Sequence, residues 1–93
     1  MDLNELRSEI DQIDDELVRL FAARMDVSAK IADYKKSHGL PILDAAREQE
    51  KLQDIAAKSD PALEADIHEL YSLLFSLSRR HQQKHNASRA DQR

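Results

Sequence analysis

The sequence of 93 residues contains no cysteine and no tryptophan, and it has only one glycine and two prolines. Without cysteine, a disulfide framework and a cysteine-ligated metal site are both excluded. The two phenylalanines and two tyrosines supply few of the aromatic side chains that strands favour. Alanine, leucine, glutamate, lysine, arginine and glutamine, which are strong helix formers, are plentiful instead. The composition therefore predicts an all-α fold in a single domain.

Two further absences limit the partners of the chain. No apolar stretch approaches the length of a membrane span, and the first five residues are acidic and amphipathic, unlike the apolar core of a secretory signal. Acidic and basic residues are mixed, and a net charge of −4 offers no basic face for nucleic-acid phosphates. We therefore expect a cytoplasmic protein that binds neither membranes nor nucleic acid, although a local cationic pocket for a small acidic ligand is compatible with this charge.

The first third of the chain has a continuous helical periodicity. Spacings of three and four residues alternate along a stripe of mostly apolar residues: Leu3, Leu6, Ile10, Ile13, Leu17, Leu20, Arg24, Val27, Ile31 and Tyr34. The pattern predicts one helix over about residues 2–37, which at about 1.5 Å per residue is a rod of about 50 Å. The remaining residues are too few to cover such a rod, so a partner subunit, most simply in a symmetric homodimer, is expected.

Shorter segments follow this long helix. Gly39 and Pro41 mark a connector, and a second helix is predicted over about residues 43–58, with Asp44 as its cap. Ser59-Asp60-Pro61 marks the next boundary, and a third helix is predicted over about residues 61–85. The domain thus spans residues 1–85, and the polar residues 86–93 are expected to form a disordered tail.

Cations interrupt or border this stripe of residues 3–34. Arg24 occupies a stripe position itself, Arg7 lies one turn from Leu3, and Lys35 lies one turn from Ile31. A buried charge without a partner is too costly to persist, so these residues indicate a binding site for a small anion. Long side chains that extend to solvent would explain any one of them equally well.

Polar residues also share faces with apolar ones in the later helices. Asp44 and Glu48 lie on the same side of the second helix as Leu52, and Arg47 is close enough in sequence to pair with either acid. An acidic helix start with a local ion pair is the ordinary alternative. In the third helix, the face of Phe75 continues as Ser78 and Gln82, and a solvated helix end would explain this pattern too.

His81 and His85 lie four residues apart, as two metal ligands could, but no third ligand is evident nearby. We therefore predict no metal site.

Taken in order, the polar positions resemble those of the AroQ class of all-helical chorismate mutases. The resemblance covers about residues 3–82 and rests on Leu6-Arg7, Ile10, Ile13-Asp14, Arg24, Lys35, Pro41, Asp44, Arg47-Glu48, Ser78 and Gln82. In that family, three helices from each of two chains intertwine in a homodimer with two active sites. The resemblance implies that one chain lines each site with Arg24, Lys35, Asp44, Arg47, Glu48, Ser78 and Gln82, and that Arg7 enters from the partner chain.

The resemblance also implies the role of each residue. Arg7 and Arg24, assisted by Ser78, would bind the two carboxylates of chorismate. Lys35 and Gln82 would donate hydrogen bonds to the ether oxygen, Glu48 and Asp44 would lie at the ring hydroxyl, and Arg47 would order the acids. The catalytic residues would be Lys35, Gln82, Arg24 and Glu48. The implied reaction is the pericyclic rearrangement of chorismate to prephenate in phenylalanine and tyrosine biosynthesis, without a cofactor, by a stand-alone enzyme.

Two alternatives remain open at this point. Isochorismate-pyruvate lyase shares the helical scaffold and a similar set of cations, although the Asp44, Arg47 and Glu48 set favours the hydroxyl position of chorismate. A non-enzymatic helical dimerisation module would explain the apolar stripe of residues 3–34, but it gives no reason for inward positions at Arg24, Lys35 and Gln82.

Overall fold

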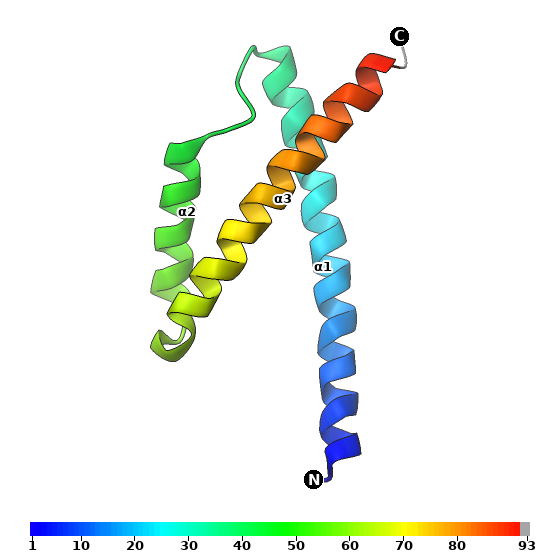
Figure 1. The fold of residues 1–93 in the computed structure, drawn as a ribbon, viewed down its shortest axis with the longest axis vertical. Helices are drawn as coiled ribbons and strands as arrows, with labels where there is room; N and C mark the ends of the chain where they lie inside the picture. Colours follow the sequence, from blue (N-terminus) through cyan, green and yellow to red (C-terminus); the bar gives the residue numbers. More distant parts are fainter. Residues whose placement is uncertain (92–93) are drawn as a thin grey trace.

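The computed structural model describes the backbone of residues 1–91 and the side chains of residues 1–88. It contains three α-helices, α1 (Leu3–Ser37), α2 (Ala45–Lys58) and α3 (Glu64–Asp91), and a short 3-10 helix, η1 (Pro61–Leu63), that leads into α3. No strand occurs over residues 1–91. The all-α class is therefore confirmed, with one long helix followed by a shorter hairpin of two (Figure 1).

The helix ends lie where local chemistry predicts them. Asp2 caps α1, since its carboxylate accepts a hydrogen bond from the amide of Glu5 at 2.8 Å. At the other end Gly39 takes a left-handed conformation, φ 65°, and the amide of Leu40 reaches the carbonyl of Lys35 at 2.8 Å. This αL turn satisfies the last carbonyls of α1 and releases the chain into the connector.

Aspartates also start the next two helices. The side chain of Asp44 accepts a hydrogen bond from the amide of Arg47 at 3.0 Å and so caps α2, as predicted. Asp60 accepts one from the amide of Ala62 at 2.9 Å, and Pro61 occupies the first position of η1. The third helical segment thus begins at Pro61, but its first turn is 3-10 rather than α.

Helix α3 holds the three helices together. Its first half runs beside α2, and its second half crosses the C-terminal half of α1 (Figure 1). The core at this crossing is small and contains as many polar as apolar side chains. Its buried members are Met25, Ser28 and Ala32 of α1, and Phe75, Ser78 and Gln82 of α3.

The buried face of α1 that meets α3 is not the apolar stripe noted in the sequence, from here on called the α1 stripe, although Arg24 of that stripe contacts α3. Leu6, Ile13 and Leu17 expose 42, 58 and 57% of their surface, and Val27 and Ile31 nearer the crossing expose 53 and 43%. The N-terminal half of α1 projects beyond the other helices, as Figure 1 shows. A single chain therefore leaves the stripe uncovered, because α2 has only 14 residues and α3 crosses α1 only at its C-terminal half (Figure 1).

The chain is accordingly elongated. Its radius of gyration is 16.8 Å and its principal extents are 56 × 30 × 14 Å, whereas a compact chain of this length would have a radius of about 12 Å. No described helix combines the length and the apolar character that crossing a membrane requires.

Helix α3 extends further than the sequence analysis expected. A disordered tail was predicted from residue 86, but the structure describes helix as far as Asp91; residues 92–93 lie outside the described part. The tertiary contact of His85, whose Nε2 lies 2.9 Å from Oδ1 of Asp33 on α1, anchors this end of α3. The good helix propensity of the two alanines and the arginine among residues 86–91 then allows the helix to continue.

Candidate functional site

A pocket of about 350 Å³ is lined by residues of all three helices. Seven of the eight predicted site residues line it: Arg24, Lys35, Asp44, Arg47, Glu48, Ser78 and Gln82. They come from α1, α2, the cap of α2 and α3, and sequence separations of up to 58 residues are brought together. Val27, Ile31, Ile42 and Phe75 provide apolar walls between them.

The pocket is strongly cationic in a chain whose net charge is −4. Five lining residues carry positive charge, namely Arg24, Lys35, Arg47, Lys51 and Arg79, against the two carboxylates of Asp44 and Glu48. Like charges gathered in a concave site repel one another unless an anion enters, so this balance suits a small polyanion.

Arg24 is held at the junction of α1 and α3. Its Nη1 donates a hydrogen bond to Oγ of Ser78 at 2.5 Å, and its guanidinium carbon lies 5.8 Å from the ring centre of Phe75. The aromatic face and the hydroxyl restrict the guanidinium to one orientation. Because Ser78 engages only part of the five-donor fork, the remaining N–H groups are available to a bidentate ligand such as a carboxylate.

Lys35 is positioned by the connector between α1 and α2. Its Nζ donates to the backbone carbonyl of Ile42 at 2.7 Å. An ammonium carries three donors, so two remain for a ligand in the pocket. The αL turn at Gly39 is what returns Ile42 to the side of α1 that carries Lys35.

A buried chain of hydrogen bonds fixes Gln82. Its Nε2 donates to Oγ of Ser28 at 2.9 Å, and Ser28 in turn donates to the backbone carbonyl of Ser78 at 3.5 Å. Gln82 is only 6% exposed, and its Oε1 has no hydrogen-bond partner within the described residues. The amide is therefore oriented by protein contacts before a ligand binds. Its second N–H remains available as a hydrogen-bond donor.

The acids at the α2 side of the pocket are not held as the sequence analysis expected. Arg47 was assigned to order Asp44 and Glu48, but its Nη1 pairs with Glu50 at 3.0 Å on the exposed surface of α2. Glu48 instead pairs with Arg79 of α3, Nη1 to Oε2, at 2.5 Å. Only the backbone amide of Arg47 contacts Asp44, and the helix cap accounts for that bond.

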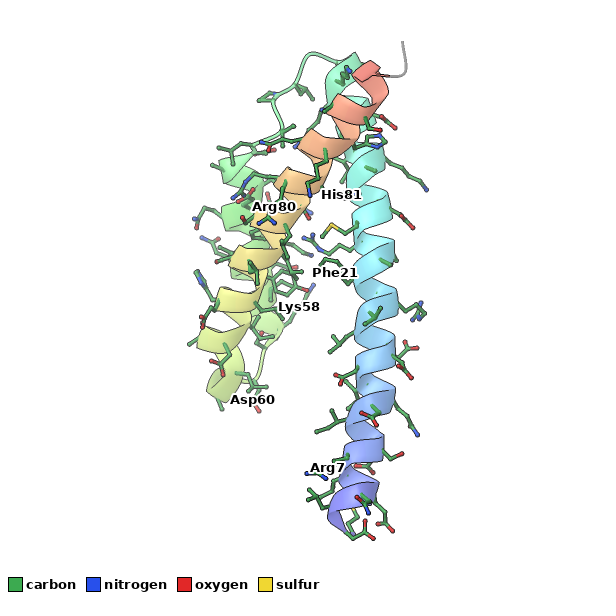
Figure 2. All side chains as sticks on the ribbon, turned by 45° about the vertical axis from the view of Figure 1, so that its right-hand side comes forward. Arg7, Phe21, Lys58, Asp60, Arg80 and His81 are labelled. Atoms are coloured by element: carbon green, nitrogen blue, oxygen red, sulfur yellow. The ribbon has the colours of Figure 1, made fainter. Side chains whose placement is uncertain are left out.

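Arg7 is the predicted residue that the chain does not bring to this pocket. It lies on the projecting half of α1, near the N-terminus, and Figure 2 places it far from Arg80 and His81 of α3. Seventeen residues of helix separate it from Arg24, a distance of about 25 Å.

The histidine pair of α3 does not form a metal site with its neighbours. His85 contacts Asp33, and over the described residues no group of three or more potential metal-ligating side chains is found.

Three polar pocket residues, Ser28, Lys51 and Arg79, were missed by the sequence analysis. Each follows a residue already noted by four positions, namely Arg24, Arg47 and Phe75, and so shares a helix face with it. Helical spacing alone could have identified them, but serine, lysine and arginine are so common on solvated helix faces that the structure was needed to single them out.

Comparison with known proteins gives a consistent family. The model for chorismate mutase type II matches residues 6–83. The T-protein of Haemophilus influenzae is 41% identical over 66 residues, which are 70% of this chain and 18% of that protein. Chorismate mutase of Methanocaldococcus jannaschii is 38% identical over 47 residues, 50% of this chain and 48% of the relative. 4-Amino-4-deoxychorismate mutase of Streptomyces venezuelae is 37% identical over 46 residues, 50% of this chain and 45% of the relative.

The aligned segments thus span less than half the length of each of these three relatives. The family model, by contrast, covers most of the present chain, including every residue of the pocket, and it confirms the family that the polar positions indicated. The chain belongs to the chorismate mutase type II family.

Proposed function

We propose that the protein is a chorismate mutase, which rearranges chorismate to prephenate without a cofactor. The observation that carries the proposal is the convergence of seven predicted residues from three helices on one cationic pocket of about 350 Å³. The reaction is pericyclic and needs neither a nucleophile nor a general base. What it needs is a flexible dicarboxylate held in a compact conformer and charge stabilisation as the ether bond breaks.

The carboxylates of chorismate are bound by arginines. Arg24, already oriented by Ser78 and Phe75, has free N–H groups that can bind one carboxylate in a bidentate manner. Because these contacts are restrained before the substrate arrives, less side-chain entropy is lost on binding.

Stabilisation of the transition state falls to Lys35 and Gln82. As the C–O bond breaks, negative charge grows on the ether oxygen, and a fixed ammonium and amide N–H bind that charge more strongly than the neutral ether. One such donor contributes on the order of 3 kcal/mol by analogy with oxyanion holes. The bonds to Ile42 and Ser28 support this role, since they fix both donors in place.

The ring hydroxyl is assigned to Glu48. Arg79 occupies Oε2 of this carboxylate, and Oε1 can accept a hydrogen bond from a hydroxyl in the pocket. Asp44 lies at the same end, where its carboxylate caps α2.

We further propose that the working unit is a homodimer in which Arg7 enters the site of the partner. The uncovered α1 stripe supports this arrangement, because its side chains are 42–59% exposed from Leu3 to Leu20 and would be covered by a second copy. The position of Arg7, about 25 Å along α1 from Arg24, supports it too, because the residue can reach such a pocket only from another chain.

The assembly can be tested by placing a charge in the stripe. Ile13→Asp should lower the sedimenting mass from about twice 10.7 kDa to 10.7 kDa and abolish activity. Val18→Asp changes a still more exposed side chain outside the stripe, 70% against 58% for Ile13, and should leave the dimer intact. A wild-type protein that sediments as a monomer would contradict the homodimer.

The activity is tested by incubating the purified protein with chorismate and, separately, with isochorismate. The proposal expects chorismate to disappear and prephenate to form at a rate well above the uncatalysed one. Release of pyruvate from isochorismate without prephenate formation would assign the pocket to the lyase reaction. Absence of both reactions would leave a non-enzymatic dimerisation module.

A further inference from the structure

The Glu48–Arg79 pair changes the charge that the pocket presents to the ring of its substrate. The two side chains are 25 and 33% exposed, they come from different helices, and both line the pocket. Arg79 was not among the residues that the sequence pointed to, and the carboxylate and hydroxyl chemistry assigned above does not use its charge. Its guanidinium makes the Glu48 position a neutral ion pair rather than a free carboxylate.

The other charged groups at this end of the pocket are already satisfied elsewhere. Arg47 pairs with Glu50 at 3.0 Å, and Lys51 pairs with Asp54 at 3.5 Å. The carboxylate of Asp44 accepts the amide of Arg47 at the helix cap. Arg79 is therefore the cation whose removal would uncover a negative charge at Glu48.

We propose that Arg79 is a specificity-determining residue, which makes the pocket prefer a substrate with a ring hydroxyl over one with a ring ammonium group. The inference rests on the proposed function, because it takes Glu48 as the residue that meets the ring substituent. A neutral hydroxyl donates a hydrogen bond to the free Oε1 of Glu48, and its binding depends little on the net charge of the Glu48–Arg79 pair. An ammonium group gains little from a carboxylate that is already paired, and it is repelled by the guanidinium.

Both kinds of substrate occur among the relatives, since one similar protein is a chorismate mutase and another is a 4-amino-4-deoxychorismate mutase. The two substrates differ at the position that the proposed function places at Glu48, and the charge of that single position can therefore separate them. Such discrimination by an unfavourable contact is a common way to achieve specificity.

The experiment measures kcat/KM for chorismate and for 4-amino-4-deoxychorismate, at a mildly acidic pH that keeps the ring amine protonated. It uses the unmodified protein, R79M, R79K and E48Q. The matched control is R80M, because Arg80 is exposed, adjacent in sequence and outside the pocket, and its loss changes the net charge of the chain equally.

The ratio of the two kcat/KM values is the readout. The unmodified protein should prefer chorismate, and R79M should shift the ratio towards the amino substrate by about tenfold or more, as expected for one charge at about 6 Å and an effective dielectric constant of about 40. R79K and R80M should keep the ratio of the unmodified protein. E48Q leaves Arg79 unpaired and should shift the ratio the opposite way.

An Arg79 that only braced α2 against α3 would lower both rates alike in R79M and leave the ratio unchanged, and that result would overturn the inference. So would a preference of the unmodified protein for the amino substrate. If R79M did not fold, E48Q would still decide, since an unchanged ratio there also contradicts the charge argument. Failure of the unmodified protein to turn over either substrate would instead overturn the proposed function, and this inference with it.

Discussion

The hydroxyl of Ser28 lies 2.9 Å from Nε2 of Gln82 and links that amide to the backbone carbonyl of Ser78 at 3.5 Å. The serine thus restrains a side chain from α3 through a group on α1, inside the small core where the two helices cross. In the proposed mechanism Ser28 does not bind the substrate itself, because its hydroxyl proton and one lone pair are already used in these two hydrogen bonds.

Ser28→Ala should therefore act through Gln82. We expect kcat to fall about fivefold, the rate equivalent of about 1 kcal/mol for a lost buried hydrogen bond, and the free energy of unfolding to fall by a similar amount. Steady-state kinetics and urea unfolding measure the two effects. Ser72→Ala is the control, since its hydroxyl bonds only to the carbonyl of His68 on the exposed side of α3. An unchanged kcat in Ser28→Ala would show that the amide needs no such restraint.

Arg24→Leu separates binding from folding. The substitution removes a half-buried cation that faces four others across the pocket, and it places an apolar side chain against Phe75. We expect kcat/KM for chorismate to fall by about a hundredfold or more, while the thermal midpoint stays the same or rises. Arg19→Leu on the same helix, where Arg19 pairs with Glu16 at the surface, should affect neither. Intact turnover in Arg24→Leu would refute the anion site.

Lys35→Met tests the charge that is proposed to act only in the transition state. Methionine keeps the apolar stem but removes the ammonium group, so kcat should fall by about 10²–10³ while KM changes little. Lys36→Met, one residue along and exposed, provides the control. If KM rose and kcat did not change, Lys35 would bind the ground state and the assignment to the ether oxygen would be wrong.

The composite site can be tested by mixing two inactive variants. Arg7→Ala and Arg24→Ala should each be inactive alone, but a mixed dimer carries one site in which both arginines are intact. With random exchange of subunits, half of the dimers are mixed and each has one working site, so about a quarter of the wild-type activity should return. If no activity returned on mixing, although both variants form dimers, the composite site would be wrong. Arg7 and Arg24 would then come from the same chain, or Arg7 would belong to no site.

Local chemistry made much of the fold predictable. The αL turn at Gly39 and the caps at Asp44 and Asp60 involve residues close in sequence, so their outcome does not depend on the rest of the chain. The ordered polar positions likewise identified seven pocket residues, through their resemblance to the AroQ class. The end of α3 was placed too early, because the contact between His85 and Asp33 joins two helices and leaves no local signal.

Partner choice among charges could not be predicted in the same way. Arg47 has two acids three residues away, Asp44 and Glu50, and helix spacing allows a pair with either of them. The structure pairs it with Glu50, and Glu48 pairs with Arg79 of α3. That selection depends on how α2 and α3 pack, as does the choice of Met25, Ser28 and Ala32 rather than the α1 stripe as the face that meets α3.

Half of the buried core at the helix crossing is polar, and all three of these polar residues, Ser28, Ser78 and Gln82, line the pocket. Folding and ligand recognition are therefore linked equilibria that draw on one cluster of side chains. A dianion bound there would neutralise cations that otherwise repel one another across the crossing, and it would complete the interior of the protein. Above the Kd, each tenfold increase in the concentration of such a ligand should add about 1.4 kcal/mol to the free energy of unfolding. The melting temperature of this protein should therefore report on the occupancy of its site.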